Sequence, residues 1–394
     1  MTVTLDVPRT MSTAVTLTVP SSETVTKKSF YRPELDVLRF CAFFAVFLFH
    51  FSHPVEFYTE HGVPRPIATA ANSLMQAGVY GVDLFFVLSA YLITELLVRE
   101  KNECGVLDVR GFYMRRILRI WPLYFFYVGL ALVPALNPDH AFTWRYAASF
   151  LVLAGNWSII AYGWPGHSIA IPLWTVSIEE QFYLLWPLLV RRLSRNRITA
   201  AAIGMLIVSN ATRAAMIAVH GGTNSIWCNT LGRLDPIAAG VLVAALLRGR
   251  IPKFRLGARL GMLSCGIFPL AFVANYWRIH ASTRLEWIPT LAGFPVVAAA
   301  CTVIMLSVLG ISLPPPRPLL YLGRISYGLY VYHELGRLLS TKIIPMDRSL
   351  VGLALRPSVV LGITILLAST SYAVLEKPFL KIKKRFARID SRPV

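Results

Sequence analysis

Apolar runs of close to twenty residues recur along this chain and restrict what it can fold into. A helix needs about twenty predominantly apolar residues to cross the hydrocarbon core of a bilayer. The sequence therefore predicts an all-α, polytopic bundle of transmembrane helices, with about ten spans and one further apolar run at 145–160. The ten spans are predicted near residues 36–53, 78–97, 121–136, 172–190, 199–219, 232–247, 258–275, 288–310, 319–340 and 356–375.

Composition agrees with a membrane protein and argues against a nucleic-acid partner. Of the 394 residues 55% are hydrophobic and only 15% are charged. The formal net charge of +19 would suit nucleic acid. However, the Lys and Arg residues fall in short loops between apolar runs, where the positive-inside rule accounts for them. The five cysteines are scattered, which favours small apolar residues over a disulfide framework.

The basic loops also predict the topology. With ten spans, all the strongly basic loops lie on the side of the N-terminus. If 145–160 crossed as well, the cluster from Arg191 to Arg197 would move to the other side. We therefore predict that 145–160 is re-entrant or interfacial, as is allowed where protein or water covers it. Both termini are then cytoplasmic.

Three segments are predicted from composition. Residues 1–29 are rich in Thr, Ser and Val and have no apolar core, so we expect a disordered cytoplasmic tail. Residues 30–378 form the predicted transmembrane domain. Residues 379–394 are basic and polar, so we expect a cytoplasmic tail and no appended soluble domain.

Arg39 and His50 lie in the first apolar run, where ionisable groups are costly. Their spacing is eleven residues, about three helical turns, which places them on one helix face roughly 16 Å apart along the axis. A cation near one membrane surface and a titratable imidazole deeper along the same face indicate one shared polar cavity.

Adjacent carboxylates, Glu179 and Glu180, lie in the fourth span together with Ser177. They point about 100° apart on a helix, so both can face protein only if the helix is surrounded. One alternative is a structural carboxylate paired with an arginine. We favour the other, in which the pair lines the functional cavity and orients or stabilises an imidazole, with Ser177 as a hydrogen-bond donor.

His333 is a second histidine predicted near mid-membrane depth, in the ninth span. It is either a buried structural group or a catalytic one, and both readings stay open. Its neighbour Glu334 would hold its tautomer only if the two side chains met, although adjacent helical residues do not face each other.

Three arginines, Arg115, Arg116 and Arg119, lie in the segment after the second span. Topology explains their charge but not the exclusive use of arginine. The planar guanidinium suits phosphate, so these residues are candidates for a cytoplasmic phosphate-bearing ligand.

Taken together, these stretches resemble the acyltransferase-3 family of multi-span membrane O-acyltransferases, which modify bacterial glycans and some small molecules. One departure is Ala90, where the family usually has Gly. The matching stretches, in family order, are 35–39 with His50, 81–89, 115–122, 174–187, 326–333 and 376–378.

The resemblance implies acetyl-CoA, or another acyl-CoA, as a cytoplasmic donor substrate. It implies no permanently bound cofactor and no metal. It also implies that His50 is the central catalytic residue, with Arg39 as its required companion. The expected acceptor is a hydroxyl of a glycan or of a glycosylated molecule, and the expected partners besides it are membrane lipids.

A different class of function fits part of the same pattern. Buried His, Glu and Arg also suit a proton-coupled transporter or a flippase of a glycan or lipid-linked substrate. The sequence lacks the internal repeat of many transporters, and the arginine-rich cytoplasmic segment favours the enzyme. Acceptor identity, acyl length and oligomeric state are not encoded in any motif of the sequence.

Overall fold

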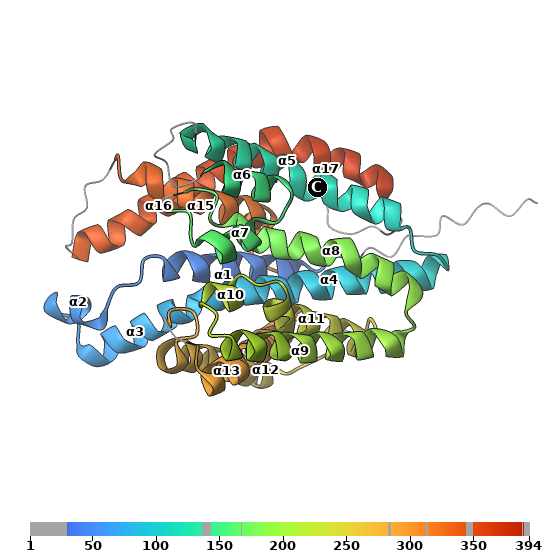
Figure 1. Ribbon diagram of the computed structural model, residues 1–394, viewed down its shortest axis with the longest axis horizontal. Helices are drawn as coiled ribbons and strands as arrows, with labels where there is room; N and C mark the ends of the chain where they lie inside the picture. Colours follow the sequence, from blue (N-terminus) through green and yellow to red (C-terminus); the bar gives the residue numbers. More distant parts are fainter. Residues whose placement is uncertain are drawn as a thin grey trace, which may run out of the picture.

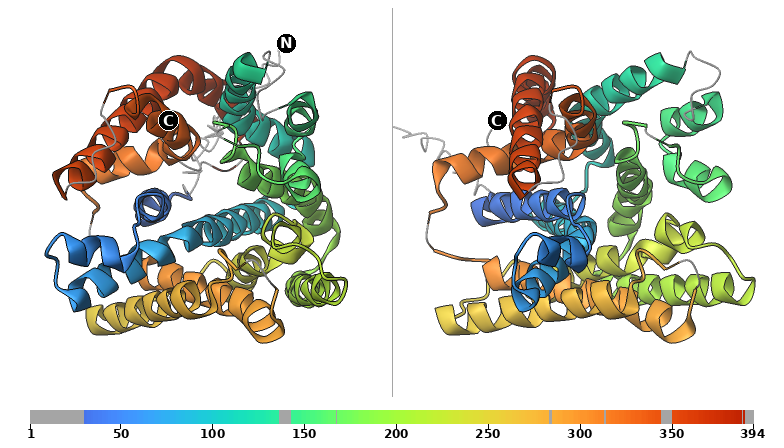
Figure 2. Two further views of the ribbon diagram at one scale, coloured as in Figure 1. Left: turned by 60° about the vertical axis from the view of Figure 1, so that its left-hand side comes forward. Right: turned by 90° about the vertical axis from the view of Figure 1, so that its left-hand side faces the viewer.

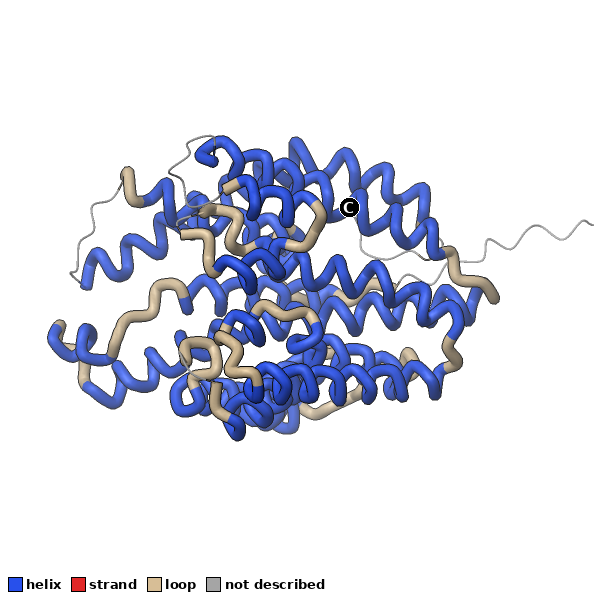
Figure 3. Tube along the Cα trace, viewed as in Figure 1, coloured by secondary structure: helices blue, strands red, loops and turns tan. Residues whose placement is uncertain are grey.

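The computed structural model describes residues 30–135, 143–166, 168–282, 285–312, 314–343, 350–387 and 389. In these ranges the chain is helical and contains no strand, which agrees with the predicted all-α class (Figure 3). The predicted tail at 1–29 lies outside the described residues, as do positions 388 and 390–394 of the predicted C-terminal tail.

The helices follow one another with short connections. They are α1 (Pro33–Phe49), α2 (Val55–Glu60), α3 (Arg65–Ala77), η1 (Gly78–Tyr80), α4 (Gly81–Cys104), α5 (Val109–Ala135), α6 (Trp144–Leu151), α7 (Gly155–Tyr162), α8 (Leu173–Arg192), α9 (Arg195–Ala218), α10 (Asn224–Trp227), η2 (Leu231–Arg233), α11 (Leu234–Leu247), α12 (Leu256–Phe272), η3 (Val273–Trp277), α13 (Trp287–Val308), α14 (Arg317–Arg324), α15 (Ser326–Ser340), α16 (Leu350–Ser371), η4 (Tyr372–Glu376), α17 (Lys377–Lys383) and η5 (Lys384–Phe386).

The long helices run side by side along the longest axis of the molecule (Figure 1). Helix α4 lies in the interior and packs against α1, α8, α11 and α13. One group of helices, α9 with α11 to α13, lies below it in Figure 1, and α5, α15 and α16 lie above. The turned views show the same arrangement, with α1 between the two groups (Figure 2).

Six helical segments in the described ranges are long and apolar enough to cross a membrane. They agree with six of the predicted spans and support a multi-pass membrane protein. The other four predicted spans are helical but shorter or more polar, so the total of ten remains a prediction. The six are Arg65–Cys104, Val109–Val133, Arg195–Ala218, Leu256–Trp277, Trp287–Val308 and Leu355–Phe386.

Two predicted segments are broken. The run at 145–160 forms α6 and α7, each of 8 residues, joined by a turn in which Leu153 has φ of 58°. Eight helical residues rise only about 12 Å, so neither helix can span a bilayer alone. The predicted span 319–340 is also two helices, α14 and α15, separated at Ile325.

The three arginines predicted in the segment after the second span, Arg115, Arg116 and Arg119, lie within α5. The helix begins at Val109, twelve residues before the predicted span at 121. The charged turns continue the apolar helix without a break, which a hydropathy pattern does not reveal.

Two glycines let α1 approach α4 closely. A Cβ at Gly78 would overlap the carbonyl oxygen of Ala45, and a Cβ at Gly81 would overlap that of Ala42. Small residues at such contacts allow helix backbones to pack directly in membranes. This packing fixes the end of α1, from which the first candidate catalytic residue projects.

Buried ion pairs join η2 to α4 and α11 to α9. Arg233 of η2 pairs with Asp83 of α4 at 3.0 Å, and Asp235 of α11 pairs with Arg213 of α9. All four side chains are almost fully buried. The sequence spacing predicts that Arg233 and Asp235, two residues apart, do not face each other, and the structure confirms that each pairs with another helix.

Candidate functional site

His50 lies at the end of α1 and not within a longer helix, as the predicted span 36–53 implied. The helix ends at Phe49, and the backbone N–H of His50 still donates to the carbonyls of Val46 and Phe47, at 3.3 and 3.2 Å. The hydroxyl of Ser52 then donates to the carbonyl of Phe49 at 2.8 Å. The half-buried imidazole of His50 therefore projects from a helix terminus that local hydrogen bonds hold in place.

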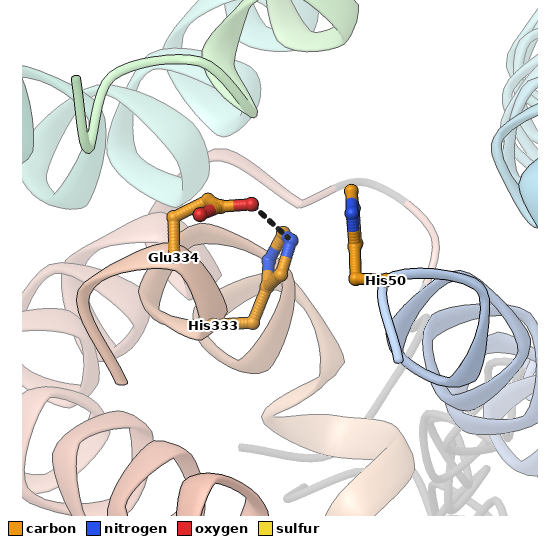
Figure 4. A group of neighbouring side chains, drawn as sticks. All are labelled: His50, His333 and Glu334. Atoms are coloured by element: carbon orange, nitrogen blue, oxygen red, sulfur yellow. Dashed lines mark ion pairs between the residues drawn. The ribbon is translucent and has the colours of Figure 1, made fainter. Parts of the chain in front are cut away.

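His333 of α15 lies directly against His50 (Figure 4). The ring centroids are 5.2 Å apart and the ring planes are inclined by 30°. His333 is 2% exposed, and its Nδ1 lies 2.6 Å from the carbonyl oxygen of Tyr330. Because a carbonyl oxygen only accepts, Nδ1 carries the proton. In the neutral ring the lone pair is then on Nε2, which has no hydrogen-bond partner within the described residues.

Glu334 is the carboxylate nearest this histidine pair. Its Oε1 lies 3.7 Å from Nε2 of His333, and it accepts a hydrogen bond from Nη1 of Arg337 at 2.7 Å. Side chains of adjacent helical residues do not normally face each other, but the Glu334 carboxylate bends back toward the imidazole of His333 (Figure 4). The tautomer of His333 is nevertheless fixed by the Tyr330 carbonyl and not by Glu334.

His50, His333 and Glu334 each offer one atom within 4.8 Å of the others, a set that could hold a metal ion. Arg337 already shares the Glu334 carboxylate, so a cation would compete with the guanidinium for it. We therefore interpret the group as two imidazoles with a nearby anion.

The two histidines line a large hollow, here called the histidine cavity, with a volume of about 650 Å³. It also contains His280, Trp164, Trp174 and Trp227, which the sequence analysis missed. The Nε2 of His280 lies 3.3 Å from Oε1 of Gln76. Trp164 and His280 come from connecting segments and Trp227 from a four-residue helix, where no periodic pattern marks them, and Trp174 lies in the first turn of α8.

A much smaller hollow of about 60 Å³, here called the neck, adjoins the histidine cavity. Val82 and Tyr330 line both spaces. Arg39 and Glu179 line the neck as well. The predicted companion of His50 therefore lies in the hollow next to that of the imidazole.

A third hollow of about 90 Å³, here called the basic hollow, adjoins the neck at Arg39. Arg116 and Arg119 line it, together with Lys383 near the C-terminus. The Nε of Arg39 has no hydrogen-bond partner among the described residues. Three hollows thus follow one another, with Arg39 at the first junction and Tyr330 at the second.

Three predicted site residues lie apart from these hollows. Arg115 is buried, pairs with Glu100 at 2.8 Å and donates to the carbonyl of Phe386 at 2.6 Å. Glu180 accepts from the indole of Trp121 at 3.0 Å. These contacts commit both side chains to packing between helices, so the structure does not bring Arg115 together with Arg116 and Arg119.

Ser177 is also placed in helix packing. Its hydroxyl oxygen accepts from the backbone N–H of Gly155 at 3.2 Å and donates to the carbonyl of Leu173 at 3.3 Å. It joins α8 to α7 and lines none of the three hollows. The position expected for Glu179 or Glu180, beside an imidazole, is occupied by Glu334.

The arrangement offers specific chemistry. An imidazole with a free nitrogen can accept a proton or carry an acyl group, and a carboxylate nearby stabilises the imidazolium that forms. The arginines in the basic hollow present planar donors that suit a phosphate group. The neck connects the two kinds of group.

Comparisons with known proteins identify the family that the chain resembles. A family model described as an acyltransferase domain, acyltransferase-3, matches residues 32–375. The chain is 28% identical to "Putative peptidoglycan O-acetyltransferase YrhL" of Bacillus subtilis over 88% of its own length and 55% of that protein. It is 28% identical to "O-acetyltransferase OatA" of Staphylococcus aureus over 77% of its own length and 50% of that protein. The chain thus spans about half the length of these relatives. No solved structure matches it.

Proposed function

The chain belongs to the acyltransferase-3 family, and from this premise we propose that it is a membrane O-acetyltransferase. The donor is acetyl-CoA bound from the cytoplasm, and the acceptor is a hydroxyl group of a glycan or glycosylated molecule. The relatives whose names specify O-acetyl transfer support this reaction. The observation that carries the proposal is the adjacency of the basic hollow, the neck and the histidine cavity.

The donor is proposed to enter at the basic hollow. Its phosphates contact Arg39, Arg116 and Arg119, because guanidinium groups form charge-assisted, often bidentate hydrogen bonds to phosphate. The thin pantetheine arm passes through the neck, past Glu179 and Tyr330. This route delivers the thioester to the histidine cavity and leaves the bulky nucleotide outside.

Acyl transfer then requires a base at the acceptor hydroxyl. His50 takes the hydroxyl proton while the oxygen attacks the thioester carbonyl, and the C–S bond breaks to release the CoA thiolate. The imidazolium returns its proton to the thiolate. In the covalent alternative the acyl group rests on an imidazole nitrogen before the hydroxyl attacks. In both routes Glu334 stabilises the positive charge that develops on the histidine pair.

His333 is proposed to position His50. The ring of His333 stacks on that of His50 at an inclination of 30° and is fixed by the Tyr330 carbonyl, so it limits how the His50 ring can turn. Its free Nε2 also makes it a second proton acceptor in the cavity.

We place the protein in the bacterial cytoplasmic membrane with ten crossings and both termini cytoplasmic. This topology puts the basic hollow on the side where acetyl-CoA is found. The segments α6 and α7, too short to cross, then form the re-entrant or interfacial element. The apolar helices and the bacterial relatives support this placement.

The experiment is acetyl transfer by the purified protein in detergent, with labelled acetyl-CoA and candidate glycans. His50→Ala is expected to abolish transfer, and His53→Ala, in a histidine three residues away that does not line the cavity, is the matched control. Labelled product without any ion gradient supports the enzyme. Transfer that persists in His50→Ala contradicts the mechanism, and substrate movement that depends on a proton gradient would support a transporter.

A further inference from the structure

Three tryptophans, here called the aromatic wall, line one part of the histidine cavity. Trp164, Trp174 and Trp227 all line it, although they come from different segments, the α7–α8 connection, α8 and α10. The rings of Trp164 and Trp174 are 6.2 Å apart at 83°, and those of Trp174 and Trp227 are 6.4 Å apart at 42°. The three indoles therefore form one continuous surface beside the histidine pair.

Trp164 is the exposed member of this wall and is held in place. It is 41% exposed, whereas Trp174 and Trp227 are 5% and 8% exposed. Its indole N–H donates to Oδ1 of Asn224 at 3.1 Å, and its ring meets the edge-on ring of Trp174. A large aromatic face that is both fixed and open to a cavity is typical of a ligand-binding surface.

Another part of the cavity is polar. Helix α15 contributes Glu334, Arg337 and Thr341, and α16 contributes Arg356. An acyl or lipid chain would cover this polar part and leave Arg356 without a partner, which costs free energy. A pyranose ring fits both parts, because its C–H face packs on an aromatic ring while its hydroxyl edge forms hydrogen bonds.

The charged groups in the cavity indicate the charge of the ligand that would fit it. One carboxylate and two guanidinium groups line it. Glu334 and Arg337 pair with each other at 2.7 Å. Arg356 forms no hydrogen bond or ion pair with the other described residues. One positive charge is therefore left for a ligand.

From these observations we infer that the acceptor is a sugar with an acidic substituent. Its pyranose ring stacks on Trp164, its acidic group faces Arg356, and the hydroxyl to be acylated lies at the histidine pair. This inference rests on the proposed acyltransferase function and goes beyond it by assigning the acceptor site and the charge class of its ligand.

The test compares two acceptors that differ by one carboxylate, using the full chain in detergent with labelled acetyl-CoA. One is the disaccharide of two N-acetylglucosamine units, and the other carries a lactyl ether carboxylate on one ring. The wild type is expected to favour the acidic acceptor in kcat/KM. Arg356→Gln is expected to lower that preference about tenfold, the loss of one charge-assisted hydrogen bond.

Trp164 is tested by paired substitutions. Trp164→Leu is expected to raise the KM for the acceptor about fivefold to tenfold without a matching change in the KM for acetyl-CoA, because an aromatic contact is lost. Trp164→Phe, which keeps an aromatic face, is expected to recover most of the affinity. Trp144→Leu is the matched control, because Trp144 is 74% exposed and does not line the cavity.

Each outcome decides the inference. An unchanged acceptor KM in Trp164→Leu overturns the stacking site, and equal kcat/KM for the two wild-type acceptors overturns the acidic class. Failure to acylate either sugar, in protein that still hydrolyses acetyl-CoA through His50, overturns the sugar assignment while the enzyme stands. Failure to turn over acetyl-CoA at all contradicts the proposed function itself.

Discussion

Arg39 lies at the junction of the basic hollow and the neck, so its replacement should affect donor binding more than chemistry. Hydrogen bonds to charged groups contribute about 1.5–3 kcal/mol. Since about 1.4 kcal/mol corresponds to a factor of ten, Arg39→Gln should raise the KM for acetyl-CoA roughly 10-fold to 150-fold. Arg39→Lys keeps the charge but loses the planar fork of donors, so its KM for acetyl-CoA should lie between those of the wild type and Arg39→Gln.

The assay is steady-state transfer of labelled acetyl at a fixed, saturating acceptor concentration, with protein in detergent. Arg192→Gln is the matched control, because Arg192 is an exposed arginine at the end of α8 and lines none of the three hollows. A KM for acetyl-CoA that does not change in Arg39→Gln would refute the reasoning, whatever happens to kcat. A similar rise in Arg192→Gln would show that overall charge, and not the hollow, attracts the donor.

Two further predictions concern the pairings described above, and a third concerns the topology. Asp83→Ala leaves the fully buried guanidinium of Arg233 without its 3.0 Å partner and should destabilise the fold by about 3–5 kcal/mol. Thermal unfolding in detergent should show a clear fall in Tm, and an unchanged Tm contradicts a role of this ion pair in stability. Glu334→Gln removes the anion beside the two imidazoles and should lower kcat about tenfold or more. Glu103→Gln, at an exposed carboxylate, is the control, and an unchanged kcat in Glu334→Gln argues against charge stabilisation by Glu334. In a variant with Cys104 as its sole cysteine, this exposed residue at the end of α4 should react with a membrane-impermeant maleimide only after cells are permeabilised. Labelling of intact cells contradicts the proposed topology.

Local patterns in the sequence predicted the features that depend on one helix. The apolar runs marked the long helices, because a twenty-residue apolar stretch has few other stable forms near a membrane. The two carboxylates at 179 and 180 were expected to diverge, and one lines the neck while the other accepts from Trp121. The helical angle of about 100° between neighbours is sufficient for that conclusion.

Features that depend on tertiary packing could not be predicted in this way. His50 and His333 are far apart in the sequence, and only the contacts of α1 with α15 bring their rings to 5.2 Å. The packing of α14 on α1 is tertiary as well, and it is so close that a Cβ at Gly323 would overlap the carbonyl oxygen of Asp36. Trp164 lies in a connection between helices, where neither period nor charge marks it.

The most direct test of the proposed donor route is an experimental structure with a non-hydrolysable acetyl-CoA analogue bound. The route predicts phosphate groups against Arg39, Arg116 and Arg119, the pantetheine arm in the neck, and the thioester carbonyl carbon within about 3.5 Å of a reacting atom at the histidine pair. An analogue that binds with its phosphates elsewhere, or whose arm reaches the histidine cavity without passing Arg39 and Tyr330, would contradict it.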